Sequence, residues 1–131
     1  MKKLTLLWTL AVLFAVTLCA QIPDTPAGRQ FSAWLTAFNS GDRDTMQQFF
    51  DKHMPFGRIE QDMTIRSETG GFDVKKVEES SDTRVVVMVQ ERGSGKQFLR
   101  IAMNVGAAEP YQVAGLRFQG WSRRRAWRLR K

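Results

Sequence analysis

The chain has 131 residues, of which 20 are lysine or arginine and 13 are aspartate or glutamate, and its formal net charge is +7. The length predicts one small domain, and a single cysteine with a single histidine excludes a disulfide framework and a cluster of cysteine and histidine metal ligands. Residues 21–120 hold 12 of the basic residues and all 13 acidic ones, so this part is nearly neutral and argues against a nucleic-acid-binding domain.

The chain begins with Met-Lys-Lys, continues with an apolar run over residues 4–18 and then reads Cys19-Ala20-Gln21. Basic residues, a short apolar run and a small residue at its end are typical of a secretory signal peptide. The run is shorter than the roughly 20 residues of a membrane span. We therefore expect residues 1–20 to be a signal peptide cleaved near Ala20, and the mature protein to be periplasmic or secreted from a bacterium.

Two alternatives to cleavage stay open. The apolar run could be retained as an N-terminal anchor, or Cys19 could become the acylated first residue of a lipoprotein. Leu18 argues against acylation, because the residue before a lipid-bearing cysteine is normally small. If cleavage follows Ala20, the mature chain has no cysteine, and its stability must come from packing alone.

The first half of the body predicts helices. Thr25 suits the N-cap of a first helix, Pro26 suits its first position, and Asn39-Ser40-Gly41 ends it. Asp42 can cap a second helix, and a weaker third helix is expected from about residue 58 to 68, after a break at residues 55–57. Their apolar faces are predicted to be Phe31, Trp34, Leu35 and Phe38, then Met46, Phe49 and Phe50, then Ile59 and Met63.

From Phe72 the apolar period changes from helical to alternating, which predicts four strands. The first contains Phe72, Val74 and Val77, with an irregularity between the two valines, and the others cover residues 84–91, 97–105 and 111–118. A bulge is expected at Ala114-Gly115, where the apolar parity changes. Three helices followed by a four-stranded antiparallel meander predict an α+β fold, in which the helices pack on one face of a curved sheet as a cone with an apolar mouth.

Four segments carry a family resemblance: TPAGRQF at 25–31, WLTAFNSGD at 34–42, GGFD at 70–73 and VQER at 89–92. Together with the order of the elements, they resemble the NTF2-like (cystatin-like α+β) superfamily. The match is sharpest to the N-terminal accessory domain of bacterial secreted serine hydrolases and S41-type peptidases, and it covers about residues 25–119. The resemblance implies a cone-shaped domain that accompanies a catalytic domain, and a sheet face that can form a homodimer.

The chain departs from those relatives in its chemistry. None of its seven serines is followed three positions later by a lysine, and it contains no Gly-x-Ser-x-Gly motif. A catalytic domain would follow in the relatives, whereas here only a short basic tail follows the last predicted strand. We therefore expect a non-catalytic accessory or binding module, with a fragment of a larger serine hydrolase or peptidase as an open alternative, and no enzyme activity or cofactor.

His53 is the only histidine. A catalytic triad would need it beside a carboxylate such as Asp51 and an activated serine, and no sequence motif indicates which serine that would be. A structural role at the end of the second helix is expected instead, where a cationic side chain complements the helix dipole. No metal site is expected, because one histidine leaves only carboxylates, and these lack calcium-loop spacing.

The candidate ligand-pocket residues are Phe31, Trp34, Phe38, Asp62 and Tyr111. An isomerase mechanism like that of ketosteroid isomerase would need a carboxylate base and a donor to an enolate oxygen, for which Asp62 and Tyr111 are the candidates. The alternative is plainer: the aromatic stripe is core, while Glu60, Asp62 and Arg66 form a solvated helix face.

Two surfaces are further candidates. Phe98, Arg100 and Asn104 lie on the second face of their strand and could line a groove or a dimer surface. The tail could bind anionic lipid or single-stranded nucleic acid through Trp121, Arg123, Arg124, Arg125, Trp127 and Arg128, or be a disordered solvated end or the product of a shifted reading frame. The expected partners are a hydrolase domain or a second copy, with no specific nucleic acid, and membrane contact only through this tail or an uncleaved leader.

Overall fold

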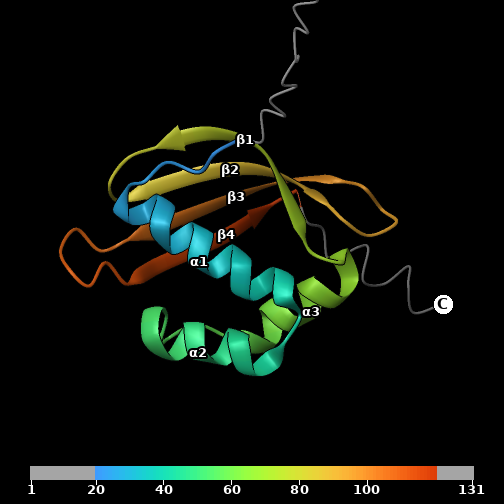
Figure 1. The fold of residues 1–131 in the computed structure, drawn as a ribbon, viewed down its shortest axis with the longest axis horizontal. Helices are drawn as coiled ribbons and strands as arrows, with labels where there is room; N and C mark the ends of the chain where they lie inside the picture. The colour runs from blue at the N-terminus through green and yellow to red at the C-terminus, as the bar shows by residue number, and fades with distance from the viewer. Residues whose placement is uncertain (1–19, 121–131) are drawn as a thin grey trace, which may run out of the picture.

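The computed structural model describes residues 20–120. Three helices precede four strands: α1 (Pro26–Ser40), α2 (Arg43–His53), α3 (Ile59–Thr69), β1 (Phe72–Ser80), β2 (Arg84–Glu91), β3 (Phe98–Val105) and β4 (Val113–Gln119). The strands form one open antiparallel sheet in the order β1-β2-β3-β4. Figure 1 shows the three helices on the same side of the sheet, with α1 between the sheet and α2. The predicted α+β fold is confirmed.

Several predictions concern residues that the structure does not describe. The signal peptide and Cys19 lie outside residues 20–120, as does the basic tail with its candidates Trp121, Arg123, Arg124, Arg125, Trp127 and Arg128. These predictions therefore stay expectations from the sequence.

The boundaries of α1 and α2 follow from local capping. The Thr25 hydroxyl accepts a hydrogen bond from the Gly28 backbone N–H at 3.0 Å, and Pro26 occupies the first turn, where its missing N–H costs nothing. Gly41 ends α1 in the left-handed region with φ 66°, which favours glycine. The Asp42 carboxylate then accepts from the Thr45 N–H at 2.9 Å and caps α2. Both predicted caps are confirmed.

Helix α3 differs from its prediction in the face that it buries. Its buried residues are Asp62, Ile65 and Thr69, which lie one turn apart, whereas Ile59 and Met63 are only half-buried. Ile59 and Met63 do pack against the core, as expected, but the fully buried residues of α3 were missed because that stripe begins with a carboxylate. A search for apolar periodicity does not count an acid as a core position.

The sheet bends where its register shifts. Strand β1 shifts against β2 between Val74 and Lys76 and again between Val77 and Glu79, which confirms the expected irregularity. Strand β4 shifts against β3, since Asn104 pairs with Gly115 while Val105 pairs with Val113, leaving Ala114 as the extra residue of a bulge. The predicted bulge is confirmed, although the strand covers 113–119 instead of 111–118.

The core lies between α1 and the inner face of the sheet. Phe31, Trp34 and Phe38 are completely buried on α1. The Phe38 ring stacks on that of Phe72 at the start of β1, with centroids 4.9 Å apart. Asn39 ties the same two elements, because its side chain donates to the Phe72 carbonyl at 3.0 Å and accepts from the Phe72 N–H at 2.8 Å. The aromatic stripe predicted from the sequence is thus part of the core.

The outer face of the sheet carries ion pairs. Arg84 pairs with Glu79 at 3.3 Å, and Arg100 pairs with Glu78. Of the residues named as a groove or dimer surface, Phe98 is 56% exposed, Arg100 is in this ion pair, and Asn104 accepts from Arg84 at 3.0 Å. The face is therefore a mixed surface of charged pairs with one exposed phenylalanine.

Candidate functional site

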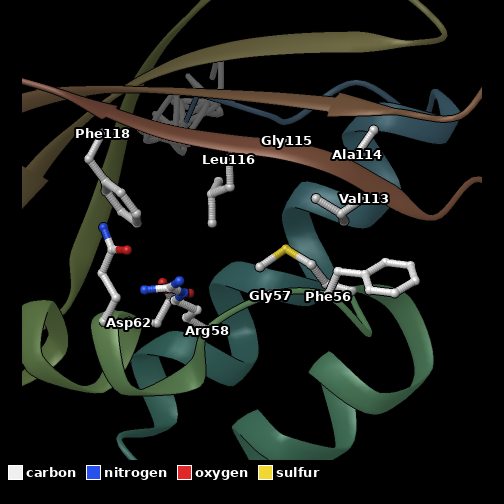
Figure 2. A pocket seen from close by; sticks show the side chains of 11 residues that line it. Phe56, Gly57, Arg58, Asp62, Val113, Ala114, Gly115, Leu116 and Phe118 are labelled. Atoms are coloured by element: carbon white, nitrogen blue, oxygen red, sulfur yellow. The ribbon is translucent and has the colours of Figure 1, made fainter.

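A pocket with a volume of about 300 Å³ opens between α3, the segment that joins α2 to α3, and strand β4. This volume lies at the lower end of the roughly 300–1,000 Å³ that small-molecule sites occupy. Figure 2 shows Leu116 and Phe118 pointing from β4 toward the helices, with Asp62 and Arg58 on the opposite side. The pocket is lined by Met54, Phe56, Gly57, Arg58, Gln61, Asp62, Val113, Ala114, Gly115, Leu116 and Phe118.

Asp62 is the acidic residue of the lining and is only 4% exposed. The indole Nε1–H of Trp34 donates to its Oδ2 at 2.8 Å, which fixes the carboxyl group against α1. Burial raises the pKa of Asp62 from its ordinary value of 3.8 to about 6, and the hydrogen bond from Trp34 acts in the opposite direction. The expectation that Asp62 belongs to a solvated helix face was wrong, because its side chain is buried against Trp34 of α1.

The other two residues of that predicted face behave differently from Asp62. Glu60 is exposed and forms an ion pair with Arg43 of α2. Arg66 is half-buried, and its Nη2 donates to the Asn39 carbonyl at 3.2 Å, so it ties α3 to the end of α1. The solvated-face prediction therefore holds for Glu60 alone.

The second carboxylate oxygen of Asp62 faces the pocket. Oδ1 has no hydrogen-bond partner among residues 20–120. Within the same residues, Arg66 Nε is the one fully buried side-chain polar atom without a partner, so Oδ1 cannot be fully buried. Because Asp62 lines the pocket and is otherwise enclosed, Oδ1 reaches solvent through the pocket. The site thus offers one oriented carboxylate with a free acceptor atom.

The bulge in β4 builds the apolar wall. In a regular strand Val113 and Leu116 would point to opposite faces, because side chains alternate along a strand. The extra residue, Ala114, shifts the alternation by one position, so Val113 and Leu116 point to the same face of the sheet. Val113 is buried in the core, and Leu116 packs against the core from the same side. Phe118 continues this row, and its ring lies 5.8 Å from that of Trp34. One irregularity therefore places three apolar side chains opposite α3.

The segment between α2 and α3 forms the rim. Gly57 is required there, since a Cβ at this position would lie 2.4 Å from Met54 Cε and 2.6 Å from Phe50 Cε1. Phe56 is 98% exposed, and Figure 2 shows its ring directed away from Asp62. Arg58 is exposed and has no hydrogen bond or ion pair with any residue that the structure describes. The rim thus carries an exposed aromatic ring and an unpaired guanidinium.

Of the five candidate pocket residues, Asp62 alone lines this pocket. Phe31, Trp34 and Phe38 are buried in the core, and Trp34 reaches the site through its hydrogen bond to Asp62. Tyr111 precedes β4 with φ 52°, and its carbonyl accepts from Gln30 Nε2 at 2.9 Å. The structure therefore does not bring Tyr111 to Asp62. Arg58, Gln61 and the β4 wall carry no sequence pattern that indicates a pocket; only the break at residues 55–57 indicated a rim.

His53 and Asp51 do not form a catalytic pair. The His53 ring packs on Phe49, with centroids 5.0 Å apart, and burial followed by the charge of Lys52 lowers the pKa of His53. Asp51 instead accepts a hydrogen bond from Gln47 at 2.8 Å. In the part of the chain that the structure covers, no three histidine, cysteine or acidic side chains gather as a metal site would require.

Comparisons of the chain with protein-family models, with curated proteins and with solved structures found no match. Between residues 20 and 120, no helix combines the length and the apolar character needed to cross a bilayer. The pocket with Asp62 is therefore the feature on which a functional interpretation depends.

Proposed function

We propose that the chain is a secreted, non-catalytic module of the NTF2-like type that binds a small amphipathic molecule between α3 and β4. The observation that carries this proposal is the cavity of about 300 Å³ into which Asp62 Oδ1 opens. Binding sites for small molecules combine an apolar wall with few, well-placed polar groups. Here Val113, Leu116 and Phe118 supply the wall, and the polar groups are on the α3 side.

The residues of the lining favour binding over covalent catalysis. They include no serine, threonine, cysteine, histidine, lysine or tyrosine, so apart from the Asp62 carboxylate the pocket lacks the usual nucleophiles. His53 packs on Phe49 and is not part of the lining. An accessory role beside a hydrolase domain agrees with the family that the sequence resembles, and the pocket would then supply the recognition step.

A titration followed by two-dimensional NMR tests this proposal. We expect small aromatic fragments to shift the amide signals of α3 and β4, because these elements form the two walls. Phe98→Ser is the matched control: it removes the exposed ring of the outer sheet face and should leave the affinity unchanged. Shifts centred on the outer face, or no shifts with any fragment at millimolar concentration, would contradict the proposal.

One observation favours a second candidate function, namely proton transfer by Asp62. A carboxyl group with a pKa of about 6 is a better general base near neutral pH than an ordinary aspartate. Arg58 and Gln61 are the side chains of the lining that could donate to a developing enolate oxygen. The test is isomerisation of a β,γ-unsaturated ketone: this function requires measurable turnover, and its loss in Asp62→Asn. Binding without turnover leaves the first proposal standing alone.

The proposed secretion has a separate test. Expression of the complete chain in a Gram-negative host should yield a periplasmic protein whose measured mass is that of a chain beginning at Gln21. A mass that includes Met1 would favour a retained anchor, and a diacylglycerol adduct on Cys19 would favour a lipoprotein.

A further inference from the structure

We propose that the pocket selects small apolar molecules that carry a protonated amine, with Asp62 as the counter-ion. This inference rests on the proposed binding function and names the chemical class of the ligand. It follows from the absence of a charged partner for Asp62, the geometry of its two oxygens and the apolar wall opposite.

The charge of Asp62 lacks a partner in the described residues. Buried carboxylates are normally paired with a cation, because an isolated charge loses its hydration without compensation. Asp62 has no ion pair with any residue from 20 to 120, and the changes in its pKa arise from burial and from the neutral Trp34 donor, with no contribution from a charged neighbour. A cation in the pocket would supply the missing partner.

The two oxygens of Asp62 have different surroundings. Trp34 Nε1 occupies Oδ2 at 2.8 Å and holds the carboxylate in one orientation, while Oδ1 opens to the pocket. An ammonium group has three donors and forms strong charge-assisted hydrogen bonds with a carboxylate oxygen. A hydroxyl group would offer one weaker donor, and a carboxylate would be repelled.

The lining contains one other charged group, the guanidinium of Arg58. Arg58 also lines the pocket, but its side chain is exposed, and its nitrogens lie more than 4.0 Å from the Asp62 oxygens, since the two residues form no ion pair. Water and salt screen an exposed charge far more than a buried one. Apart from Asp62 and Arg58, the lining contains no ionisable side chain: β4 contributes Leu116 and Phe118, and the α2–α3 segment contributes Met54. Trp34 of α1 contacts Asp62 from the core, outside the lining. The buried anion should therefore set the preference.

The experiment compares three probes with one ring and different charges: benzylamine, benzyl alcohol and benzoate. Each is titrated into the ¹⁵N-labelled protein at pH 7.5, and the amide signals of α3 and β4 are followed. We expect benzylamine to bind at least ten-fold more tightly than benzyl alcohol, and benzoate to bind most weakly. In Asp62→Asn this preference should fall to within about two-fold, because asparagine keeps the acceptor for Trp34 but carries no charge. Arg58→Gln is the matched charge variant and should strengthen benzylamine binding a few-fold.

The outcomes separate this inference from the proposed function. Equal binding of benzylamine and benzyl alcohol to the unchanged protein would overturn the inference and leave the binding function intact. Tightest binding of benzoate would also overturn it, by making Arg58 the determinant. If no probe shifts α3 or β4, both fail. Should Asp62→Asn not fold, lowering the pH from 7.5 to 5 provides the same test: benzylamine affinity should fall about ten-fold as Asp62 is protonated, while benzyl alcohol affinity stays constant.

Discussion

Replacing Asp62 with asparagine should stabilise the protein at neutral pH. Asparagine has nearly the same shape, and its side-chain oxygen can still accept the hydrogen bond from Trp34 Nε1. What it removes is a charge in a site that is only 4% exposed. Because burial raises the pKa of Asp62 in the folded protein, the folded state binds the proton more tightly than the unfolded chain does.

The size of the effect follows from the pKa. A rise from 3.8 to about 6 corresponds to roughly 3 kcal/mol, at about 1.4 kcal/mol for each unit. The stability that this group contributes is greatest below pH 3.8, falls as the pH rises to about 6 and is constant above that value. At pH 7.5, Asp62→Asn should therefore gain about 2–3 kcal/mol, which for a domain of this size raises Tm by roughly 10 °C or more.

Urea unfolding of the unchanged protein and the variant at pH 7.5 and at pH 3.5 measures this gain. Other acids also change the stability with pH: hydrogen bonds lower the pKa values of Asp42, Glu60 and Glu78, so the fold loses stability as these groups are protonated at low pH. This loss is the same in both proteins, so the difference between them at each pH reports on Asp62. Glu68→Gln, an exposed carboxyl group on the same helix, is the matched control and should change stability by less than about 0.5 kcal/mol. A loss of stability in Asp62→Asn at pH 7.5, or an equal gain at both pH values, would refute the reasoning.

Three other substitutions test the structure around the site. Trp34→Phe should cost about 2–3 kcal/mol in urea unfolding and raise the pKa of Asp62 further, as carboxyl NMR would detect, because it deletes the Nε1 donor; an unchanged pKa would contradict the assigned hydrogen bond. Asn39→Ala should cost about 2 kcal/mol in the same assay, since two hydrogen bonds to the Phe72 backbone are lost. Phe56→Ser should alter stability by less than about 0.5 kcal/mol in urea unfolding, because the ring is 98% exposed; a clear loss of stability would place the ring in the core instead.

Much of the fold could be predicted because its boundaries depend on neighbouring residues. The Thr25 and Asp42 caps each act within three residues, and Gly41 ends α1 through its own backbone conformation. The bulge at Ala114 is equally local, since a change of apolar parity in one strand is enough to indicate it. Such features are readable without knowledge of the tertiary structure.

The site could not be predicted to the same extent, because contacts between distant segments create it. The partner of Asp62 is Trp34, 28 positions earlier, and the wall opposite is formed by β4, more than 50 positions later. From the sequence, Asp62 between Glu60 and Arg66 has the pattern of a solvated surface. Only the packing of α3 against α1, with β4 across the pocket, removes it from water and thereby raises its pKa.

The wall that faces Asp62 belongs to the last strand of an open sheet. Among residues 20–120, strand β4 pairs with β3 on one side only, so it can separate locally at a lower free energy than the inner strands β2 and β3. Local opening of β4 would let the cavity widen for ligands of different sizes while the core between α1 and the inner strands stays packed. A ligand bound between α3 and β4 would in turn stabilise this edge strand against local opening. Ligand binding would therefore slow amide hydrogen exchange along β4.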